Sequence, residues 1–337
     1  MTHSSNKTAL VIGATGSFGA HAAQAMIKHG WIIRALARDP VAAAAKAGPR
    51  TPIEWVKGDA MDAASVRAAA EGVSVIVHAA NPPGYRNWKG TVLPMMESTI
   101  AAAKAVGARV VLPGNVYNYA PDAGGHIAEG APQAPVTRKG KIRVEMERRL
   151  ATSGVKSLIL RSGDFFGPAA PNSAFGWLTT RSKDRVTGVY APGAAAHAFA
   201  YMPDLAETLA RLLDAEDRLA DVDSFHFRGH LLADGELGAS MRRVTRQPQL
   251  KIAAFPWIVV WAAAPFVETF RELLEMRYLW NREIGLSQAR LEAFLGDVPA
   301  TPLDTAVRAT VHDLGCLVED APYAATACAS ASMAPTM

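Results

Sequence analysis

The first half of the chain alternates short apolar runs with stretches of helical periodicity. The apolar runs predict six strands, at residues 8–12, 31–37, 54–57, 74–79, 109–112 and 157–161. The stretches between them predict helices at 20–29, 63–71, 93–106 and 139–152. Strands separated by helices favour a parallel sheet covered on both faces. The pattern therefore predicts a doubly wound α/β (Rossmann) fold, with the ligand at the carboxyl ends of the strands.

The second half of the chain loses this rhythm. Short strands are expected around 191–200 and 225–230, and helices at 203–215, 235–245 and 269–280. We interpret this half as a smaller C-terminal α/β substrate domain packed over the strand ends. The expected division is a dinucleotide-binding domain at 1–165, a mainly substrate-binding domain at 166–319 with some segments returning to the Rossmann sheet, and a disordered tail at 320–337.

One uncharged stretch, residues 253–267, is continuously apolar and contains two prolines. It is too short to span a bilayer, which takes about 20 residues. A buried helix or the wall of a substrate cavity is the favoured interpretation, and a peripheral membrane contact or a subunit interface is the alternative. No transmembrane segment is expected.

Composition excludes some function classes. The chain has 337 residues, with 35 basic and 31 acidic side chains, and a net charge of +4 is too small and too scattered to predict nucleic-acid binding. The two cysteines, Cys316 and Cys328, have no metal-ligand spacing, so no metal site is expected and a reducing compartment is indicated. The first residues are polar and contain no signal peptide pattern, which favours a cytoplasmic location.

The clearest motif is the glycine triplet Gly13, Gly16 and Gly19, directly after the first strand and at the start of a predicted helix. Such a turn brings the backbone close to a pyrophosphate and points helix amide groups at it. The strand before it and the helix after it are the context that gives this motif meaning. The sequence therefore predicts dinucleotide binding.

The end of the second strand bears on the choice of cofactor. An NAD-preferring site usually has an acid there, whereas this chain has Ala37 followed by Arg38. A guanidinium can bind a 2′-phosphate with two hydrogen bonds, so NADP is favoured over NAD. Arg34 is a second candidate, Asp39 leaves NAD open, and the alternative for Arg38 is a solvated loop residue.

Over about residues 7–315, six motifs together resemble the extended short-chain dehydrogenase/reductase superfamily, in its NAD-dependent epimerase/dehydratase-like branch. They are Gly13–Gly19, Gly58-Asp59 with Asp62, Val77–Ala80, Asn115–Tyr117, Leu160–Pro168 and Tyr201–Ala206. The resemblance implies that Asp59 receives the adenine amino group, that Ala79 and Ala80 let the cofactor lie across the fourth strand, and that Asp164 lies in a hinge loop. The full set of cofactor-binding residues it implies is Gly13, Thr15, Gly16, Ser17, Phe18, Gly19, Arg38, Asp59, Ala60, Ala79, Ala80 and Lys141.

The catalytic set departs from the family pattern. The superfamily uses a tyrosine, a lysine four residues later, and a serine or threonine one strand earlier. Here Lys141 occupies the lysine position, but Thr137 replaces the tyrosine and Pro113 replaces the strand-end hydroxyl. An aliphatic hydroxyl is a far weaker acid than a phenol, whose pKa is near 10.

Residues just beyond the fifth strand are the candidate substitutes. Asn115 and Tyr117 can face the nicotinamide there, and Tyr117 or Tyr119 could supply the proton. The alternative for Tyr117 is a packing role. His197 is either a pocket residue or a solvated loop histidine.

These observations predict an NAD(P)-binding oxidoreductase-type protein that transfers hydride between NADP(H) and a carbonyl or alcohol carbon. Lys141 would orient the ribose, and Tyr117, Asn115 or Thr137 would complete the catalytic set. The non-enzymatic alternative is a catalytically silent, NADP(H)-bound sensor or partner-binding protein. The expected partner is a small-molecule substrate of hydrophobic character, and a homodimer, common in the superfamily, is left open.

Overall fold

The computed structural model describes residues 7–48, 51–82, 87–170 and 173–316. Within them, seven strands form one sheet whose pairings are all parallel. In spatial order the strands are β12 (Val222–Phe227), β7 (Ser157–Ser162), β5 (Arg109–Asn115), β4 (Val75–His78), β1 (Thr8–Ile12), β2 (Ile32–Ala37) and β3 (Ile53–Lys57). The strand order reverses between β1 and β4. A ligand crevice is expected beyond the carboxyl ends of these two strands.

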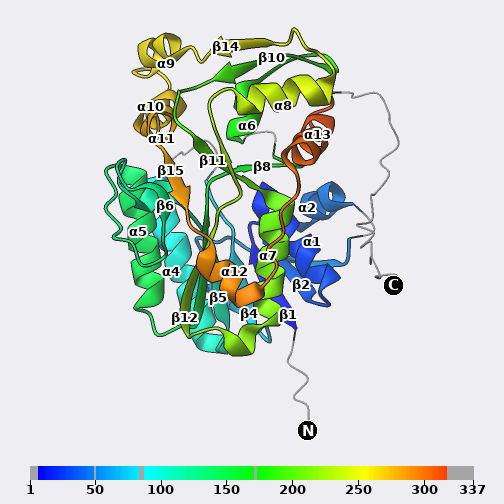
Figure 1. The fold of residues 1–337 in the computed structure, drawn as a ribbon. Helices are drawn as coiled ribbons and strands as arrows, with labels where there is room; N and C mark the ends of the chain where they lie inside the picture. The colour runs from blue at the N-terminus through cyan, green and yellow to red at the C-terminus, as the bar shows by residue number, and fades with distance from the viewer. Residues whose placement is uncertain (1–6, 49–50, 83–86, 171–172, 317–337) are drawn as a thin grey trace, which may run out of the picture.

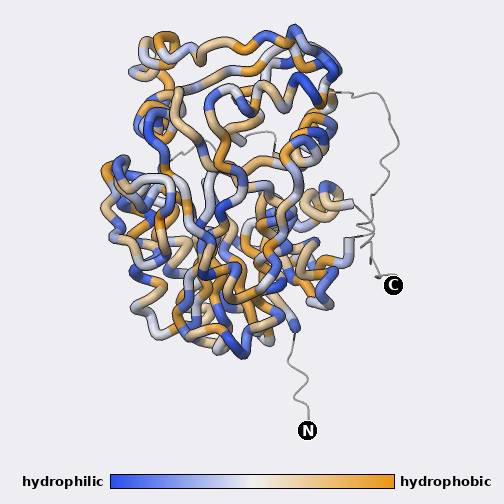
Figure 2. The backbone as a smooth tube through the Cα atoms, in the orientation of Figure 1, coloured by the Kyte–Doolittle hydropathy of each residue, from blue (hydrophilic) through white to orange (hydrophobic). Residues whose placement is uncertain are grey.

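Helices cover both faces of this sheet (Figure 1). Successive strand residues point to opposite faces, so Val11 packs towards one layer and Leu10 towards the other. The first layer contains α1 (Ser17–Lys28), α7 (Met202–Asp214) and α12 (Ala289–Leu295). The second contains α3 (Ala63–Ala69), α4 (Trp88–Val106) and α5 (Arg138–Ala151). Another helix, α2 (Pro40–Ala47), follows β2, and hydrophobic chain segments gather in the sheet between the layers (Figure 2).

A smaller α/β domain lies above the strand ends in Figure 1. Its strands are β9 (Thr179–Ser182), β10 (Arg185–Ala191) and β14 (Lys251–Ala254) in one sheet, and β8 (Asp164–Phe166), β11 (His197–Tyr201) and β13 (His230–Leu232) in another. The strands β6 (Gly124–Ile127) and β15 (Ile284–Leu286) form a separate pair that packs with the layer of α3, α4 and α5. The helices of the smaller domain are α6 (Ala174–Leu178), α8 (Glu236–Thr245), α9 (Trp257–Ala263), α10 (Glu268–Glu275), α11 (Tyr278–Asn281) and α13 (Leu303–Asp313). Two single 3₁₀ turns, Val116–Asn118 and Glu216–Arg218, complete the described elements.

The predicted fold class is confirmed, and the six strands predicted in the first half of the chain are six of the seven strands of the sheet. The run predicted at 225–230 is β12, which pairs with β7 as a seventh strand of the central sheet. The helix predicted at 269–280 is divided, because α10 ends at Glu275 and α11 begins at Tyr278. The proposed tail at 320–337 and Cys328 lie outside the described residues.

The apolar stretch 253–267 is not the buried helix that its composition favours. It contains the end of β14 and the helix α9, and in α9 Val260 is buried. Ile258, Trp261 and Phe266 are 83%, 72% and 89% exposed. The other favoured interpretation, a cavity wall, applies to two members of the stretch, Phe255 and Trp257. No helix among the described residues is long and apolar enough to cross a membrane.

Candidate functional site

The turn after β1 is shaped by glycines that the fold itself requires. Gly13 has φ +93°, and a Cβ on it would lie 2.7 Å from the backbone of Ala79 and Ala80. A Cβ on Gly19 would collide with the carbonyl of Gly13. These two glycines let α1 and the end of β4 pack closely against the turn.

Gly16 is different, because little protein packs against it. A Cβ there would meet the carbonyl oxygen of Gly13 at 3.2 Å and otherwise open space. Gly16 is the N-cap of α1 without a side-chain cap, and the first turn contains no acidic residue. Gly16, Ser17 and Phe18 all line a cavity. The amino end of α1 therefore presents an uncapped, positively polarised surface that fits the pyrophosphate of a dinucleotide.

This cavity has a volume of about 670 Å³ and lies where several parallel strands end. Residues at or just after the ends of β1, β4, β5 and β7 line it, among them Ala79, Ala80, Asn115 and Tyr117. Its size is within the range usual for small-molecule sites. The structure thus brings the glycine turn, the two alanines and the two β5-end residues of the predicted site to one cavity.

The far side of the cavity is largely apolar and aromatic. The smaller domain supplies most of this wall, with Trp177, Leu178, Phe255, Trp257, Leu273, Met276, Leu279 and Trp280. Phe18, at the start of α1, stacks on Phe165 of β8 with ring centroids 5.6 Å apart. The cavity can therefore enclose a bulky apolar group beside the polar strand ends.

Two polar side chains from the strand ends meet in this cavity. The Tyr117 hydroxyl donates to Oδ1 of Asp164 at 3.3 Å. Oδ2 of Asp164 lies 2.9 Å from Nε2 of His197, which is on β11. Asn115 accepts a hydrogen bond from the Tyr117 amide through Oδ1 at 3.0 Å, and this bond fixes its side-chain orientation. The contact between Asp164 and His197 cannot be found from the sequence, because β8 and β11 meet only through the tertiary fold.

The face of α5 that lies towards the cavity is not the one that contains Lys141, the residue at the superfamily's lysine position. The residues on its packed side are Lys139, Gly140, Arg143, Met146, Glu147 and Leu150, at helical spacing. Lys141 is exposed and is not among the described residues that line the cavity. Arg143 lines it instead, donates to the carbonyl of Pro113 at 3.4 Å, and lies over the Trp88 ring.

Two other polar residues at the start of α5 have structural partners. Thr137 is the N-cap, and its side-chain oxygen accepts from the Gly140 amide at 3.0 Å. Thr137 is buried and is not among the described cavity residues. Lys139 is also buried, and its ammonium group forms ion pairs with Glu272 and Glu275 of α10. The α5 start therefore anchors the helix to the smaller domain.

The adenosine end of the expected dinucleotide site lies at the exposed edge of the sheet. Arg38 is exposed after β2, and the described residues offer it no ion pair. Asp39 caps α2 by accepting from the Ala42 amide at 3.0 Å. Lys46, which the sequence does not single out, donates to the carbonyl of Thr15 at 2.8 Å and so lies beside the glycine turn. Arg38 therefore follows the strand end, and Lys46 is hydrogen bonded to the glycine turn.

Three further residues near this edge have defined partners. Arg34 binds Glu54 and the carbonyls of Ala69 and Glu71, so it supports the fold rather than the strand end. Asp59 is exposed, and its Oδ1 accepts from the Met61 amide at 2.9 Å, so this carboxylate closes its own turn. Ala60 packs against the core layer of α3 and α4.

His78 is a fully buried polar residue on the cavity wall. Its Nδ1 lies 2.8 Å from the Thr99 hydroxyl, and its Nε2 has no hydrogen-bond partner among the described residues. Burial and, to a lesser degree, the charge of Arg143 lower the pKa of His78 to about 3. The ring is neutral at physiological pH. Among the described residues, no group of three or more His, Cys, Asp or Glu side chains is arranged to hold a metal ion.

Comparisons with known proteins agree with this arrangement. Residues 5–129 match the NmrA-like family. No curated protein matches the sequence. The structure is similar to MoeE5 in complex with UDP-glucose and NAD, with a TM-score of 0.70, 17% identity, and coverage of 91% of this chain and 98% of that chain.

Two further solved structures resemble the chain over the same extent. WbmH of Bordetella bronchiseptica, in complex with NAD⁺, has a TM-score of 0.67 and 19% identity, covering 91% of this chain and 97% of that chain. DesIV, a dTDP-glucose 4,6-dehydratase from Streptomyces venezuelae with NAD bound, has a TM-score of 0.69 and 19% identity. The match covers 91% of this chain and 96% of that chain. The suspected resemblance to NAD-dependent epimerases and dehydratases is confirmed at the level of the fold.

Proposed function

We propose that this chain is an NADP(H)-dependent oxidoreductase that transfers hydride between the nicotinamide and a carbonyl or alcohol carbon of a bulky, apolar small molecule. The observation that carries the proposal is the joint lining of one cavity by the bare amino end of α1 and by Tyr117 and Asp164. A dinucleotide held at Gly16 and crossing Ala79 and Ala80 would bring its nicotinamide end to these polar side chains. The fold shared with NAD-bound structures supports this orientation.

When bound, the cofactor supplies or accepts a hydride, and the chain has to bind, orient and protonate. Tyr117 is the proposed proton donor, since its phenol lines the cavity and is already hydrogen bonded. Asn115 is the proposed polariser, since its amide nitrogen can donate to a substrate oxygen. Arg143 takes the cofactor-facing position on α5 that the sequence assigns to Lys141, and Thr137 acts through the position of that helix.

The choice of NADP over NAD rests on charge at the end of β2. Arg38 has no competing carboxylate among the described residues, and Lys46 adds a second cation close to the glycine turn. Asp39, the acid that would favour NAD, is engaged as a helix cap. A 2′-phosphate would therefore meet two positive groups and no free carboxylate at this edge. Asp59 is the proposed partner of the adenine amino group.

The direct test is calorimetric titration of the purified chain with NADPH, NADP⁺, NADH and NAD⁺. We expect binding, with the phosphorylated forms preferred, and loss of binding in Gly16→Val, because Gly16 lines the cavity and, beyond its chain neighbours, the only atom of the described residues near its added Cβ is the Gly13 carbonyl oxygen at 3.2 Å. Gly130→Val is the matched control, since a Cβ there meets nothing within 4 Å on a distant loop and binding should persist. Arg38→Ala should weaken the binding of NADPH by about tenfold or more and leave the binding of NADH unchanged.

Failure of the wild type to bind any of the four dinucleotides would contradict the proposal. Tight binding without turnover on a panel of aromatic and aliphatic carbonyl compounds would instead favour the silent sensor. The observation favouring that alternative is that α5 directs no phenol into the cavity, since Thr137 caps the helix and Lys139 is held by two glutamates. A cytoplasmic location and a homodimer stay predictions.

A further inference from the structure

We infer that His197 and Asp164 form a shared-proton pair that reprotonates Tyr117, in place of the tyrosine–lysine pair usual in this fold. The inference rests on the proposed function and names the proton source for it. It begins with the hydrogen-bond requirements of the His197 ring. Nδ1 lies 3.0 Å from the carbonyl oxygen of Leu279, and Nε2 lies 2.9 Å from Oδ2 of Asp164.

Each ring nitrogen of His197 therefore faces an oxygen. A carbonyl oxygen can only accept, so Nδ1 carries a proton. Two lone pairs cannot face each other at 2.9 Å, so a second proton lies between Nε2 and the carboxyl group of Asp164. The pair thus holds one proton more than a neutral imidazole beside a carboxylate. Whichever partner formally carries it, that proton can be transferred.

A second buried histidine in the same protein shows the contrasting arrangement. His226 also directs Nδ1 at a carbonyl, that of Ile127 at 2.9 Å. Its Nε2, however, faces two groups that can donate to it, the Tyr119 hydroxyl at 2.8 Å and Nη1 of Arg161 at 3.2 Å. Burial, with the charge of Arg161 adding to it, lowers the pKa of His226 to about 4. The contacts of His226 therefore require a proton on Nδ1 alone. Those of His197 require a proton on Nδ1 and a second one between Nε2 and Asp164. The difference lies in the group that faces Nε2.

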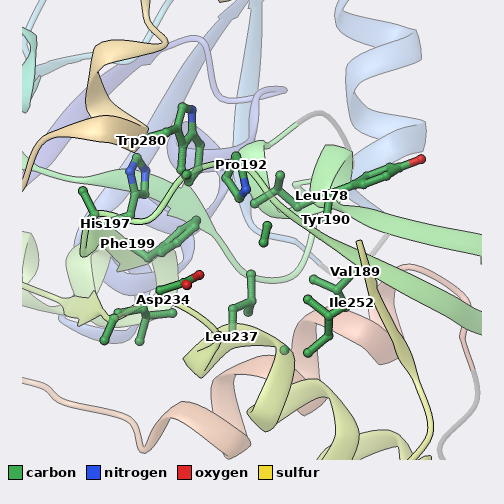
Figure 3. A pocket seen from close by; sticks show the side chains of 17 residues that line it. Leu178, Val189, Tyr190, Pro192, His197, Phe199, Asp234, Leu237, Ile252 and Trp280 are labelled. Atoms are coloured by element: carbon green, nitrogen blue, oxygen red, sulfur yellow. The ribbon is translucent and has the colours of Figure 1, made fainter. Parts of the chain in front are cut away.

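The surroundings of His197 favour a positively charged ring. Trp280 stacks on it with centroids 3.6 Å apart and planes 10° from parallel, and the two rings lie side by side at one end of a small cavity of about 50 Å³ (Figure 3). The electron-rich face of an indole attracts a cation at this separation. No Lys or Arg side chain among the described residues has an ion pair with Asp164, and the Nε2 of His197 is the nitrogen that faces this carboxyl group.

The other titratable groups that face this cluster are two tyrosines and a glutamate. Tyr117 donates to the Asp164 oxygen that His197 leaves open. Burial, and then the charges of Asp164 and Glu275, raise the pKa of Tyr278. Tyr278 therefore keeps its proton, and its hydroxyl has no hydrogen-bond partner among the described residues. Of the two phenols, Tyr117 is the one connected to the pair.

The proton balance of a carbonyl reduction then closes within named groups. The new C–H bond forms with the cofactor's hydride, and the carbonyl oxygen takes the phenolic proton of Tyr117. Asp164 accepts the shared proton from His197 on Oδ2. Rotation of the carboxyl group then turns this O–H towards the Tyr117 phenolate oxygen, which takes the proton. The pair ends one proton short and regains it from solvent. Tyr117 is thus the group that meets the substrate, while His197 and Asp164 act through it.

The test is proton and nitrogen NMR of ¹⁵N-histidine-labelled protein, which reports ring protons without any turnover. The wild type should give two downfield ring-proton signals for His197, from Nδ1 and from the shared proton, and one for His226. Asp164→Asn should abolish the shared-proton signal and leave His226 unchanged, which also shows that the variant is folded. Tyr117→Phe should retain both His197 signals, because the phenol donates to the pair rather than supplying its proton.

A single ring-proton signal for His197 in the wild type, or two signals that persist in Asp164→Asn, would overturn the inference. Both outcomes are independent of dinucleotide binding, so they are distinct from failure of the proposed function. In NADPH-loaded protein reducing phenanthrenequinone, a diketone probe, Asp164→Asn and His197→Gln should lower kcat at least about tenfold with little change in the NADPH dissociation constant. Unchanged kcat in both variants would also contradict the relay.

Discussion

At the scale of single residues, two cations on one helix have different surroundings: Arg143 faces the cavity and Lys141 faces solvent. They are two residues apart on α5, and only Arg143 lines the cavity. Arg143→Ala is expected to weaken NADPH binding by about tenfold, the usual effect of removing one charge-assisted hydrogen bond. Lys141→Ala is the matched control and should bind like the wild type. Calorimetry on the two variants decides the assignment, and the reverse order of effects would restore Lys141 as the ribose-facing cation.

The glycine residues of the site could be predicted from sequence, whereas the α5 residues could not. Gly13, Gly16 and Gly19 are recognisable because a turn geometry determines their spacing directly. The face of α5 that packs inward contains Lys139 and Glu147, which resemble solvent-exposed positions in a sequence. Their burial depends on Glu272, Glu275 and Arg161, which are far away in the chain. Counting four residues from Thr137 to Lys141 cannot take account of such partners.

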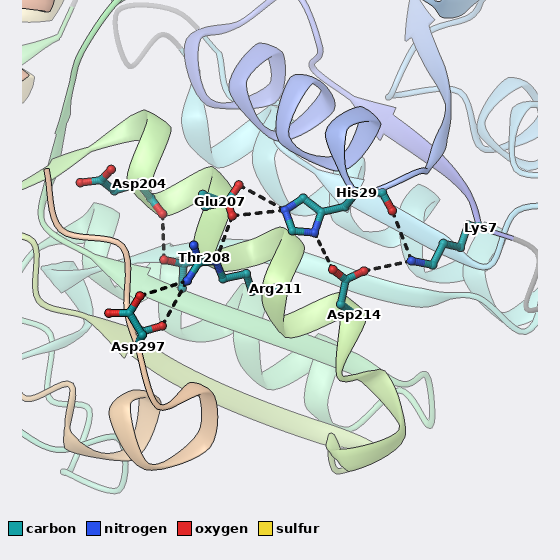
Figure 4. A network of polar contacts seen from close by, with 8 residues as sticks. All are labelled: Lys7, His29, Asp204, Glu207, Thr208, Arg211, Asp214 and Asp297. Carbon is teal, nitrogen blue, oxygen red and sulfur yellow. Dashed lines mark hydrogen bonds and ion pairs between the residues drawn. The ribbon is translucent and has the colours of Figure 1, made fainter. Parts of the chain in front are cut away.

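At the scale of elements, α1 and α7 are joined at one end by a network centred on His29 (Figure 4). His29 is hydrogen bonded to Asp214 and Glu207 of α7, and Lys7 also binds Asp214. Partial burial acts to lower the pKa of His29, but the hydrogen bonds to Asp214 and then Glu207 outweigh it and raise this pKa above its usual value. The contact is therefore strongest when His29 is protonated.

The sign of the pH effect follows from that raised pKa. The folded state binds the His29 proton more tightly than the unfolded chain, so its contribution to stability is complete below about pH 6.5 and is lost as the pH rises through the folded pKa. His29→Gln should lower the melting temperature more at pH 6 than at pH 9. Differential scanning calorimetry at the two pH values measures this, with Lys28→Gln as a neighbouring control on α1. An equal loss at both pH values would mean that packing, not charge, joins the helices.

The elements of the central sheet could be predicted because each strand is a buried apolar run between helical segments. The short strands of the smaller domain, such as β8 and β15 with three residues each, have no comparable signal. Their pairing partners are distant in sequence: β8 pairs with β11, and β15 pairs with β6. The cluster of Tyr117, Asp164 and His197 depends on the first of these pairings, and so it was not predicted from the sequence.

At the scale of the whole molecule, neutral histidines buried in the core make the fold sensitive to acid. The pKa of His78 is lowered to about 3 and that of His226 to about 4, in each case mainly by burial. The unfolded chain binds a proton at each site near pH 6.5, whereas the folded chain does not. Between about pH 4 and 6.5 the unfolded state therefore holds more protons, and stability falls as the pH is lowered. The expected slope is about 1.4 kcal/mol per pH unit for each histidine.

Urea unfolding at several pH values from about 6.5 to 4.5 measures this slope, and His78→Asn isolates the contribution of one site. The variant should be less stable than the wild type at the upper end of this range, because the hydrogen bond to Thr99 changes, but its stability should fall less steeply on acidification. His29 contributes with the opposite sign, mainly above pH 6.5, so the comparison is made below that value. His126, which is exposed, provides the control variant His126→Asn for the loss of a histidine. The expectation is contradicted if the free energy of unfolding falls equally steeply with pH in His78→Asn and in the wild type. That result would mean that His78 is protonated in the folded protein, without global unfolding.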